Sequence, residues 1–258
     1  MNKLSVAIQL GFSLAKRDIS AQYRQTFLGL LWAIFPPLVT SLTFIFLSMI
    51  GVVRVEGLDI PYPLFVFTGT IFWQMFSDSI LEPQKSMEIN KSMLSKIDFP
   101  REAIIIEALC TLGSNMLIKL IILFGIYLLF GVTLTNTTIL FFLPMLGFVA
   151  FGLFLGVLLI PIGTLYKDIQ NGVPIILSAM IFFCPVLYQP PTEGLISYIY
   201  SYNPITFYLE SIRELIYGQG EVEWFFIFIS ILIPLSLLYC ATFIFKITMP
   251  HLIERMEA

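Results

Sequence analysis

Residues 138–165, TILFFLPMLGFVAFGLFLGVLLIPIGTL, decide the fold class of this chain. The stretch contains no Asp, Glu, Lys or Arg, and it exceeds the roughly 20 apolar residues that a helix needs to cross a bilayer. A backbone surrounded by lipid must satisfy its own hydrogen bonds, so we interpret the stretch as a helix. Over the whole chain of 258 residues, 58% are hydrophobic and 12% are charged, whereas a soluble domain carries about 25% charged residues. The chain is therefore predicted to be an integral membrane protein.

Five more apolar stretches surround this one. The six expected spans are residues 30–53, 62–82, 104–130, 138–165, 171–189 and 222–247. Within the fourth span, Gly152 and Gly156 are four residues apart, a spacing that permits close helix packing inside the bundle. The predicted fold is an all-α membrane protein of one domain, residues 1–258. Its parts are an interface helix in 1–29, spans one to five in 30–189, short extracellular helices in 190–221, and span six with a cytoplasmic tail in 222–258.

Positive charge predicts the orientation of the spans, because cytoplasmic segments of membrane proteins are rich in Lys and Arg. Six spans place both termini on one side. The N-terminal segment, the loop between spans two and three, the loop between spans four and five, and the tail carry Lys3, Lys16, Arg17, Arg24, Lys85, Lys91, Lys96, Arg101, Lys167, Lys246 and Arg255. Only Arg54 and Arg213 lie on the opposite side, and Lys119 lies within the third span. Both termini are therefore expected in the cytoplasm.

Three segments lie outside the spans and have patterns of their own. Residues 4–25 are predicted to form an amphipathic helix that lies in the membrane interface, with Asp18 near its apolar side and paired with a cation. Residues 84–99 are polar but compatible with a helix, and Met93 and Leu94 belong to a partial apolar stripe. Residues 190–216 are expected to form short extracellular helices, divided at Asn203 because the residue before a proline avoids the helical region.

Several chemistries lack the residues that they need. The chain has no G-x-x-x-x-G-K-[ST] phosphate loop, so we expect no ATP site of that kind within it. No catalytic constellation and no metal-ligand cluster is apparent, and the three cysteines have no metal or redox spacing. A net charge of −3 argues against a nucleic-acid partner. Lys119 is a mid-membrane cation, which either contacts an anionic substrate group or pairs with a neighbouring carboxylate or carbonyl.

Motifs along nearly the whole chain resemble those of the membrane subunits of bacterial polysaccharide-export ABC transporters, which export O-antigen, capsule or teichoic acid. The resemblance begins with KRDISAQYRQTFLGLLWAIFPP at residues 16–37. It continues with Pro61-Tyr62-Pro63 and Gly69, with Asn90, Lys96, Phe99, Pro100 and Arg101, with Tyr166-Lys167-Asp168-Ile169, and with Pro185 and Asn203-Pro204. The family often has Tyr-Arg-Asp where this chain has Tyr166-Lys167-Asp168, and the lysine lacks the bidentate geometry of arginine.

The resemblance implies a mechanism and a set of partners. Two copies of the chain would form a homodimer in the bacterial cytoplasmic (inner) membrane and bind two ATPase subunits, which would hold the ATP and magnesium. Residues 86–99 would be a coupling helix that fits a groove on the ATPase, and the candidate coupling residues are Asn90, Met93, Leu94, Lys96, Lys167 and Asp168. The basic face of the interface helix, with Arg17 and Arg24, would help to admit the pyrophosphate end of a lipid-linked polysaccharide.

A sugar chain also needs a conduit through the membrane. The aromatic candidates for its lining are Phe72, Trp73, Phe182, Phe183 and Tyr188, because aromatic faces stack on sugar rings; the alternative for each is packing against lipid or another helix. Lys119 is a further candidate on the substrate path, as a contact for an anionic group. Other functions stay open at this point. They are an ABC permease for a drug or small lipid, a secondary transporter, which would show internal repeats, and a membrane enzyme, which would need the missing constellation.

Overall fold

The computed structural model describes residues 3–24, 35–51, 60–94, 100–132, 138–190, 194–218 and 224–257. Within these ranges every regular element is helical. The elements are α1 (Lys3–Arg24), α2 (Phe35–Met49), α3 (Tyr62–Leu94), α4 (Glu102–Leu129), the 3₁₀ helix η2 (Thr138–Phe141), α5 (Phe142–Leu165), α6 (Lys167–Met180), the 3₁₀ helix η3 (Ile181–Phe183), α7 (Leu195–Tyr202), α8 (Pro204–Tyr217) and α9 (Trp224–Glu257). The prediction of an all-α chain is confirmed over these residues.

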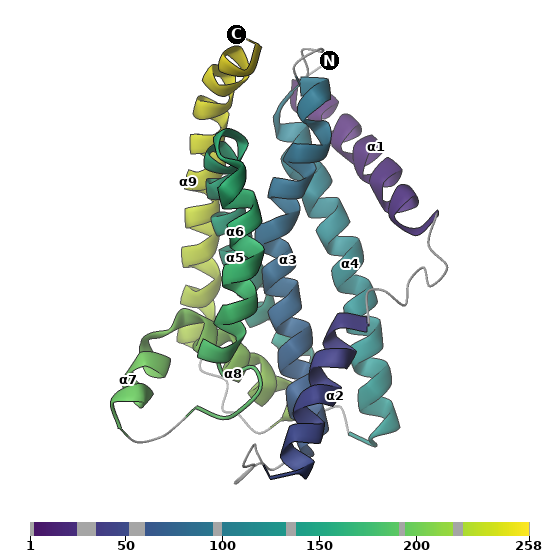
Figure 1. Ribbon diagram of the computed structural model, residues 1–258, viewed down its shortest axis with the longest axis vertical. Coiled ribbons are helices and arrows are strands. Elements are labelled where there is room, and N and C mark those ends of the chain that lie inside the picture. The colour runs from purple at the N-terminus through teal and green to yellow at the C-terminus, as the bar shows by residue number, and fades with distance from the viewer. Residues whose placement is uncertain are drawn as a thin grey trace.

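The long helices form an elongated bundle, with α3 near its centre (Figure 1). Helix α5 packs against both α3 and α9, α4 packs against α3, and α1 lies at a slant on α4. The two chain termini lie at the same end of the bundle, and α7 and α8 lie at the opposite end. We call these the terminal end and the far end.

Four described segments are long and apolar enough to cross a membrane, namely Tyr62–Leu94, Glu102–Leu129, Thr138–Leu165 and Trp224–Pro250. They correspond to the second, third, fourth and sixth predicted spans. The 15-residue α2 lies within the first predicted span but is shorter than a span by itself. Within the fifth, α6 has 14 residues and ends at Met180. Six spanning helices therefore remain an expectation.

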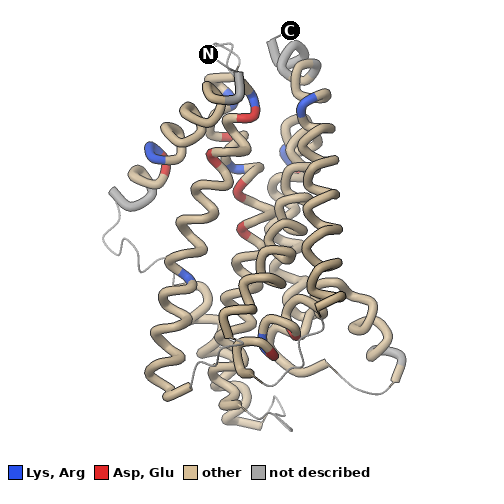
Figure 2. Tube along the Cα trace, turned by 180° about the vertical axis from the view of Figure 1, so that it is seen from behind, with Lys and Arg blue, Asp and Glu red and all other residues tan. Residues whose placement is uncertain are grey.

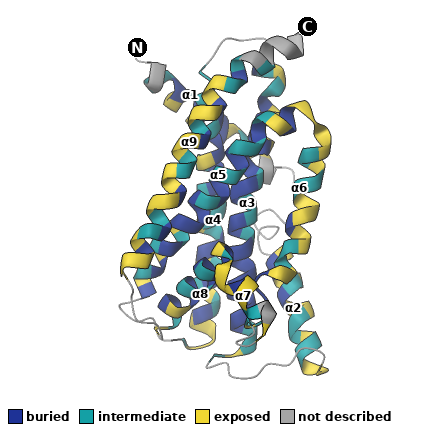
Figure 3. Cartoon of the chain, turned by 90° about the vertical axis from the view of Figure 1, so that its left-hand side faces the viewer, coloured by how far each residue is buried: buried dark blue, intermediate teal, exposed yellow. Residues whose placement is uncertain are grey.

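Burial separates an inner from an outer set of helices (Figure 3). Most side chains of α3 are buried, whereas α2, α6 and α9 expose large apolar side chains. Glycines allow α5 to approach α3 closely: a Cβ atom on Gly156 would lie 2.6 Å from the carbonyl oxygen of Ile80, and one on Gly152 would overlap Ser79 Oγ. Aromatic stacking continues this contact, with the rings of Phe76 and Phe148 4.5 Å apart. The predicted role of the two glycines in helix packing is confirmed.

Two predicted boundaries are wrong. Residues 86–94 are helical, but they continue α3 without a break, so no boundary separates them from the second span; residues 95–99 lie outside the described part of the chain. The fifth apolar stretch does not stay helical to residue 189 either. The helix and the 3₁₀ turn after it end at Phe183, and an irregular segment follows. Both errors arise because hydropathy marks where a helix leaves an apolar environment and does not mark where the helix itself ends.

Candidate functional site

Charged residues are distributed unevenly along the bundle (Figure 2). Most lie toward the terminal end, along α3, α4 and α1, and a smaller group lies at α8 near the far end. Lys119, in the interior of α4, is 6% exposed. Polar side chains of α3 and α4, including Asp78, Asn90, Glu107 and Lys119, meet where the two helices face each other.

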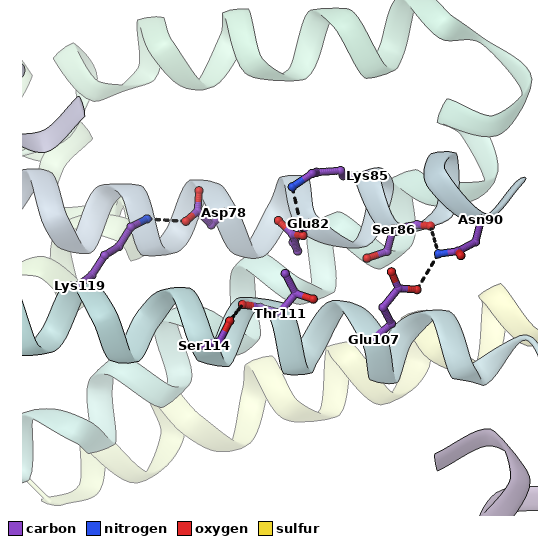
Figure 4. A network of polar contacts seen from close by, with 9 residues as sticks. All are labelled: Asp78, Glu82, Lys85, Ser86, Asn90, Glu107, Thr111, Ser114 and Lys119. Carbon is purple, nitrogen blue, oxygen red and sulfur yellow. Dashed lines mark hydrogen bonds and ion pairs between the residues drawn. The ribbon is translucent and has the colours of Figure 1, made fainter. Parts of the chain in front are cut away.

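An ion pair joins α3 and α4 in their middle parts. Lys119 forms an ion pair with Asp78, as Figure 4 shows. Of the two predicted roles of Lys119, the structure therefore shows pairing with a neighbouring carboxylate. One turn closer to the terminal end, Glu82 is buried and pairs with Lys85 at 3.5 Å. A buried charge is retained at low cost only when a partner lies close by, and these pairs provide one for each charge.

A junction of three helices lies at the terminal end of the same seam. Arg17 of α1 bonds Asp18 Oδ1 through Nε at 2.5 Å, and its terminal nitrogen donates to Asn90 Oδ1 of α3 at 3.0 Å. Asn90 Nδ2 donates to Glu107 Oε2 of α4 at 2.7 Å and to the carbonyl of Ser86 at 2.9 Å. Asn90 and Glu107 are each 1% exposed. We call Arg17, Asp18, Asn90 and Glu107 the junction residues; the predicted pairing of Asp18 with a cation is confirmed.

The junction shifts the titration of its two α1 residues in opposite directions. Burial pushes the pKa of Asp18 upward, but hydrogen bonds, foremost that from Arg17, outweigh it and hold the pKa below its ordinary value. The hydrogen bond to Asp18 raises the pKa of Arg17 in turn. Asp18 is therefore ionised near neutral pH, and Arg17 is its counterion.

At the far end, Arg213 of α8 is buried against the start of α3. Its guanidinium donates to the carbonyl oxygens of Pro185 at 2.5 Å, Val186 at 2.7 Å and Phe65 at 3.2 Å, and it stacks over the Phe65 ring at 3.7 Å. A Cβ atom on Gly69 would overlap both this guanidinium and Val186, so the glycine makes room for them. Burial lowers the pKa of Arg213 to about 10, which leaves it charged at neutral pH.

Side chains from several helices hold the irregular segment that follows η3. Tyr62 at the start of α3 donates to the carbonyl of Leu187 at 3.0 Å. The hydroxyls of Tyr188 and Tyr200 lie 2.5 Å apart, which ties the segment to α7. Asn203 caps α8, as its place before Pro204 suggests, and also donates to Cys184 Sγ at 3.6 Å. The segment is thus fixed by polar contacts on both sides.

The predicted lining residues fall into two groups. Phe72 and Trp73 are 1% and 4% exposed and pack inside the bundle, with Phe141 and Phe76 as their aromatic neighbours. Phe182 and Phe183 are exposed, and Phe182 contacts Phe44 of α2 with ring centroids 6.2 Å apart. Tyr188 lies in the irregular segment described above. Among the predicted lining residues, Phe182, Phe183 and Tyr188 therefore have exposed surface that a ligand could contact.

The predicted coupling residues are similarly divided. Asn90 belongs to the junction, and Leu94 is buried in an apolar cluster formed with α4, α5 and α9. Met93 is half-buried, while Lys167 and Asp168 are exposed at the start of α6. Lys96 and the side chain of Arg24 lie outside the described residues. Arg24 itself is the last residue of α1.

Several residues of these sites, among them Asp78, Glu107 and Arg213, were given no role in the site by the sequence analysis. Glu107 was not singled out, although a carboxylate within an apolar stretch is unusual and marks a buried partner. Arg213 counted only toward the charge balance of the extracellular side, although it stands among apolar residues at helical spacing. In both cases the signal is a single charge on an otherwise apolar helix face.

Comparison with known proteins identifies relatives of this chain. A family model described as ABC-2 type transporter matches residues 9–217. A protein of Myxococcus xanthus named O-antigen export system permease protein RfbA is 28% identical over 209 residues, which cover 80% of this chain and 79% of that protein. A protein of the same name from Klebsiella pneumoniae is 26% identical over 238 residues, 91% of this chain and 86% of that protein.

Proposed function

Because the chain belongs to the ABC-2 type transporter family, we propose that it is the permease subunit of an ATP-driven exporter that moves a lipid-linked polysaccharide of the O-antigen kind across the bacterial cytoplasmic membrane. The observation that carries this proposal is the similarity to O-antigen export permeases over about four fifths of both chains. The polymer would be attached to undecaprenyl pyrophosphate or a similar carrier. The chain itself would be a transport subunit, and a separate subunit would hydrolyse ATP.

The distribution of charge supports an orientation with the terminal end in the cytoplasm. Lys and Arg residues of α1, α3, α6 and α9 lie at this end, as the bias of positive charge toward cytoplasmic segments requires. Lys16 and Arg17 on α1 are exposed there. They supply cations at the depth where the pyrophosphate of a lipid-linked substrate would approach, and the forked guanidinium of Arg17 suits a phosphate group.

The ATPase subunits would dock at the terminal end of α3. Among the described residues of the predicted apolar stripe, Met93 keeps exposed surface at this end, whereas Leu94 faces the core. We expect Met93→Asp to lose co-purification of the ATPase subunit, because the carboxylate would be buried without a partner at the contact. Tyr202→Asp, an exposed site at the far end, is the matched control and should keep the ATPase bound.

Helix α6 is the best candidate for a wall of the conduit. Its exposed face carries the polar residues Asn171 and Ser178 beside the apolar Ile175 and Ile176, and Phe183 follows in the 3₁₀ turn. Polar side chains are costly against lipid, so this face suits water, substrate or a second copy of the chain. Helix α9 differs, because the large exposed side chains along it, such as Phe228 and Leu232, are suited to lipid. A homodimer in which α6 and the neighbouring α2 face the partner satisfies both conditions.

The proposed function is tested by deleting the gene in its own bacterium and analysing both the cell surface and the lipid-linked glycans inside the cell. We expect surface polysaccharide to be lost and the same polymer to accumulate on its carrier in the cytoplasm. Wild-type protein should restore export. Normal surface polysaccharide without accumulation would contradict the proposal. Accumulation of a teichoic acid or capsule polymer, or of a small lipid or drug, would assign the exporter to that substrate instead.

A further inference from the structure

Hydrogen bonds among the junction residues form a ring, and one contact in this ring has no donor hydrogen when both carboxyls are ionised. Arg17 donates to both Asp18 and Asn90, and Asn90 donates to Glu107. Asp18 and Glu107 interact directly as neighbouring carboxyl groups, and this interaction closes the ring. Two ionised carboxylates offer only acceptors to such a contact. The last link of the ring therefore requires a proton.

The buried oxygen of Asp18 locates this missing proton. Asp18 Oδ2 is buried and has no donor in the structure, although Arg17 bonds the other oxygen. Buried acceptors are almost always satisfied. Asp18 has a guanidinium as its direct counterion, whereas Glu107 is 1% exposed and receives its bond from a neutral amide. The proton therefore belongs on Glu107, from which it is donated to Asp18 Oδ2.

We propose that Glu107 is protonated near neutral pH and donates its proton in a hydrogen bond to Asp18, so that one exchangeable proton fastens α1 to α4. This site goes beyond the proposed function, because it needs neither a substrate nor an ATPase. It makes the position of the interface helix sensitive to the pH at the terminal end. Loss of the proton leaves two adjacent carboxylates that repel each other.

The surrounding charges act on the pair in both directions. From α1, Arg17 favours the ionised forms of both carboxyls, and from α3, Lys85 favours the ionised form of Asp18. Glu82 of α3 opposes ionisation of Glu107. Lys85 is itself paired with Glu82 and half-exposed, so it is a weak counterion for the junction. As pH rises and the shared proton leaves, attachment of α1 should therefore weaken.

Close packing makes this attachment measurable. A Cβ atom on Gly11 of α1 would lie 2.7 Å from the Cβ of Ile106 and 2.9 Å from the carbonyl oxygen of Ala103, so α1 touches α4 closely about two turns before Asp18. Any separation at the junction must open this contact as well. A distance between the two helices therefore reports on the protonation of the pair.

The first test is infrared spectroscopy of the purified full-length chain in lipid nanodiscs near neutral pH. We expect an absorption band of a protonated carboxyl that shifts in heavy water. Glu107→Gln should remove it while keeping a donor for Asp18 and an acceptor for Asn90. Asp18→Asn should also remove it, because its amide can donate to an ionised Glu107. Glu102→Gln, the same change on the same helix at a residue bound to Lys246 at 2.9 Å, should retain it.

The second test measures the distance between spin labels on Ser13→Cys in α1 and Leu117→Cys in α4, with the native cysteines replaced. From about pH 6 to about pH 9 the wild-type distances should broaden, and those of Glu107→Gln should stay narrow. A protonated-carboxyl band that survives Glu107→Gln, or one that only Glu82→Gln removes, would overturn the proposal. So would equal pH responses of wild type and Glu107→Gln. Neither test involves transport, so failure here leaves the proposed function untouched.

Discussion

Arg213 shows how one buried cation can organise a segment that has no regular structure. Its three carbonyl acceptors come from two distant parts of the chain. Residue 65 lies in α3, and residues 185 and 186 lie in the irregular segment after η3. Hydrogen bonds to a charged donor contribute more than those between neutral groups. The irregular segment after η3 therefore depends on Arg213 for its place against α3.

We expect Arg213→Met to destabilise the protein by at least about 2 kcal/mol, because three buried carbonyls lose their donor. Thermal unfolding of the purified chain in detergent measures this effect. Arg101→Met, a half-buried arginine at the start of α4, is the control and should shift the midpoint far less. Equal shifts in the unfolding midpoint for the two variants would show that the carbonyl contacts of Arg213 add no more stability than those of a half-buried arginine.

Gly156 provides a second prediction about a single residue. A methyl group there would lie 2.6 Å from the Ile80 carbonyl oxygen and 2.9 Å from that of Ser79, and neither backbone atom can rotate away. We expect Gly156→Ala to cost about 1–3 kcal/mol, as overpacking does.

The matched control is Gly125→Ala in α4, where an added Cβ would meet nothing within 4 Å. There the helix preference of alanine should leave stability unchanged or raise it by up to about 1 kcal/mol. Chemical unfolding of both variants in the same detergent compares them directly. A Gly156→Ala protein as stable as wild type would mean that α3 and α5 can move apart freely.

Among the elements, the end of α3 differs most from the prediction in which of its side chains are exposed. Sequence analysis placed Met93 and Leu94 together on a surface for the ATPase, but the structure separates them. Leu94 is 6% exposed and packs in a cluster that includes Ile104, Val157 and Phe245. A stripe on a helix can contact the helix's own bundle or a partner, and its spacing alone cannot distinguish the two.

We therefore expect Leu94→Asp to destabilise the permease itself by at least about 3 kcal/mol, through lost apolar burial and a buried charge. Met93→Asp, on the same turn but half-buried, should fold normally. Size-exclusion chromatography of each variant, expressed without any ATPase, gives the comparison. A monodisperse Leu94→Asp protein with wild-type stability would restore Leu94 to the predicted docking surface.

The parts of the fold that could be predicted from sequence depend on local interactions, whereas the parts that could not depend on contacts between residues far apart in the chain. The long spans could be placed from sequence because an apolar run reports local solvation; the fourth expected span coincides with Thr138–Leu165. The early end of α6 could not be placed, because the carbonyls of residues 185–187 are satisfied by Arg213 and Tyr62. The junction was hidden for the same reason, since Arg17 and Asn90 are 73 residues apart.

At the scale of the whole molecule, both termini lie at one end of the bundle, so the proposed orientation can be tested by labelling the two ends separately. In a chain with its native cysteines replaced, Tyr198→Cys on α7 should react with an impermeant thiol reagent in intact cells. Ser20→Cys on α1 should react only after permeabilisation, because the terminal end is expected in the cytoplasm. Both positions are exposed, so access to the reagent decides the outcome. The reverse labelling pattern would invert the proposed orientation.

The 33 residues of α3 give it a length of about 50 Å, against about 30 Å for the hydrocarbon core of a bilayer. Polar contacts hold it near both ends, at Phe65 by Arg213 and at Asn90 by Arg17. In mechanical terms α3 is a strut that is braced at each end, and tilting it would break directional bonds at two distant places. Helix α2 contacts it through Phe44 and through a hydrogen bond between Ser41 and Thr70 at 3.1 Å, and α6 packs on its flank. These contacts involve neutral groups, so they resist displacement less than the contacts of the two arginines do. The load of a transport cycle should therefore displace these two flanking helices while the strut keeps its inclination.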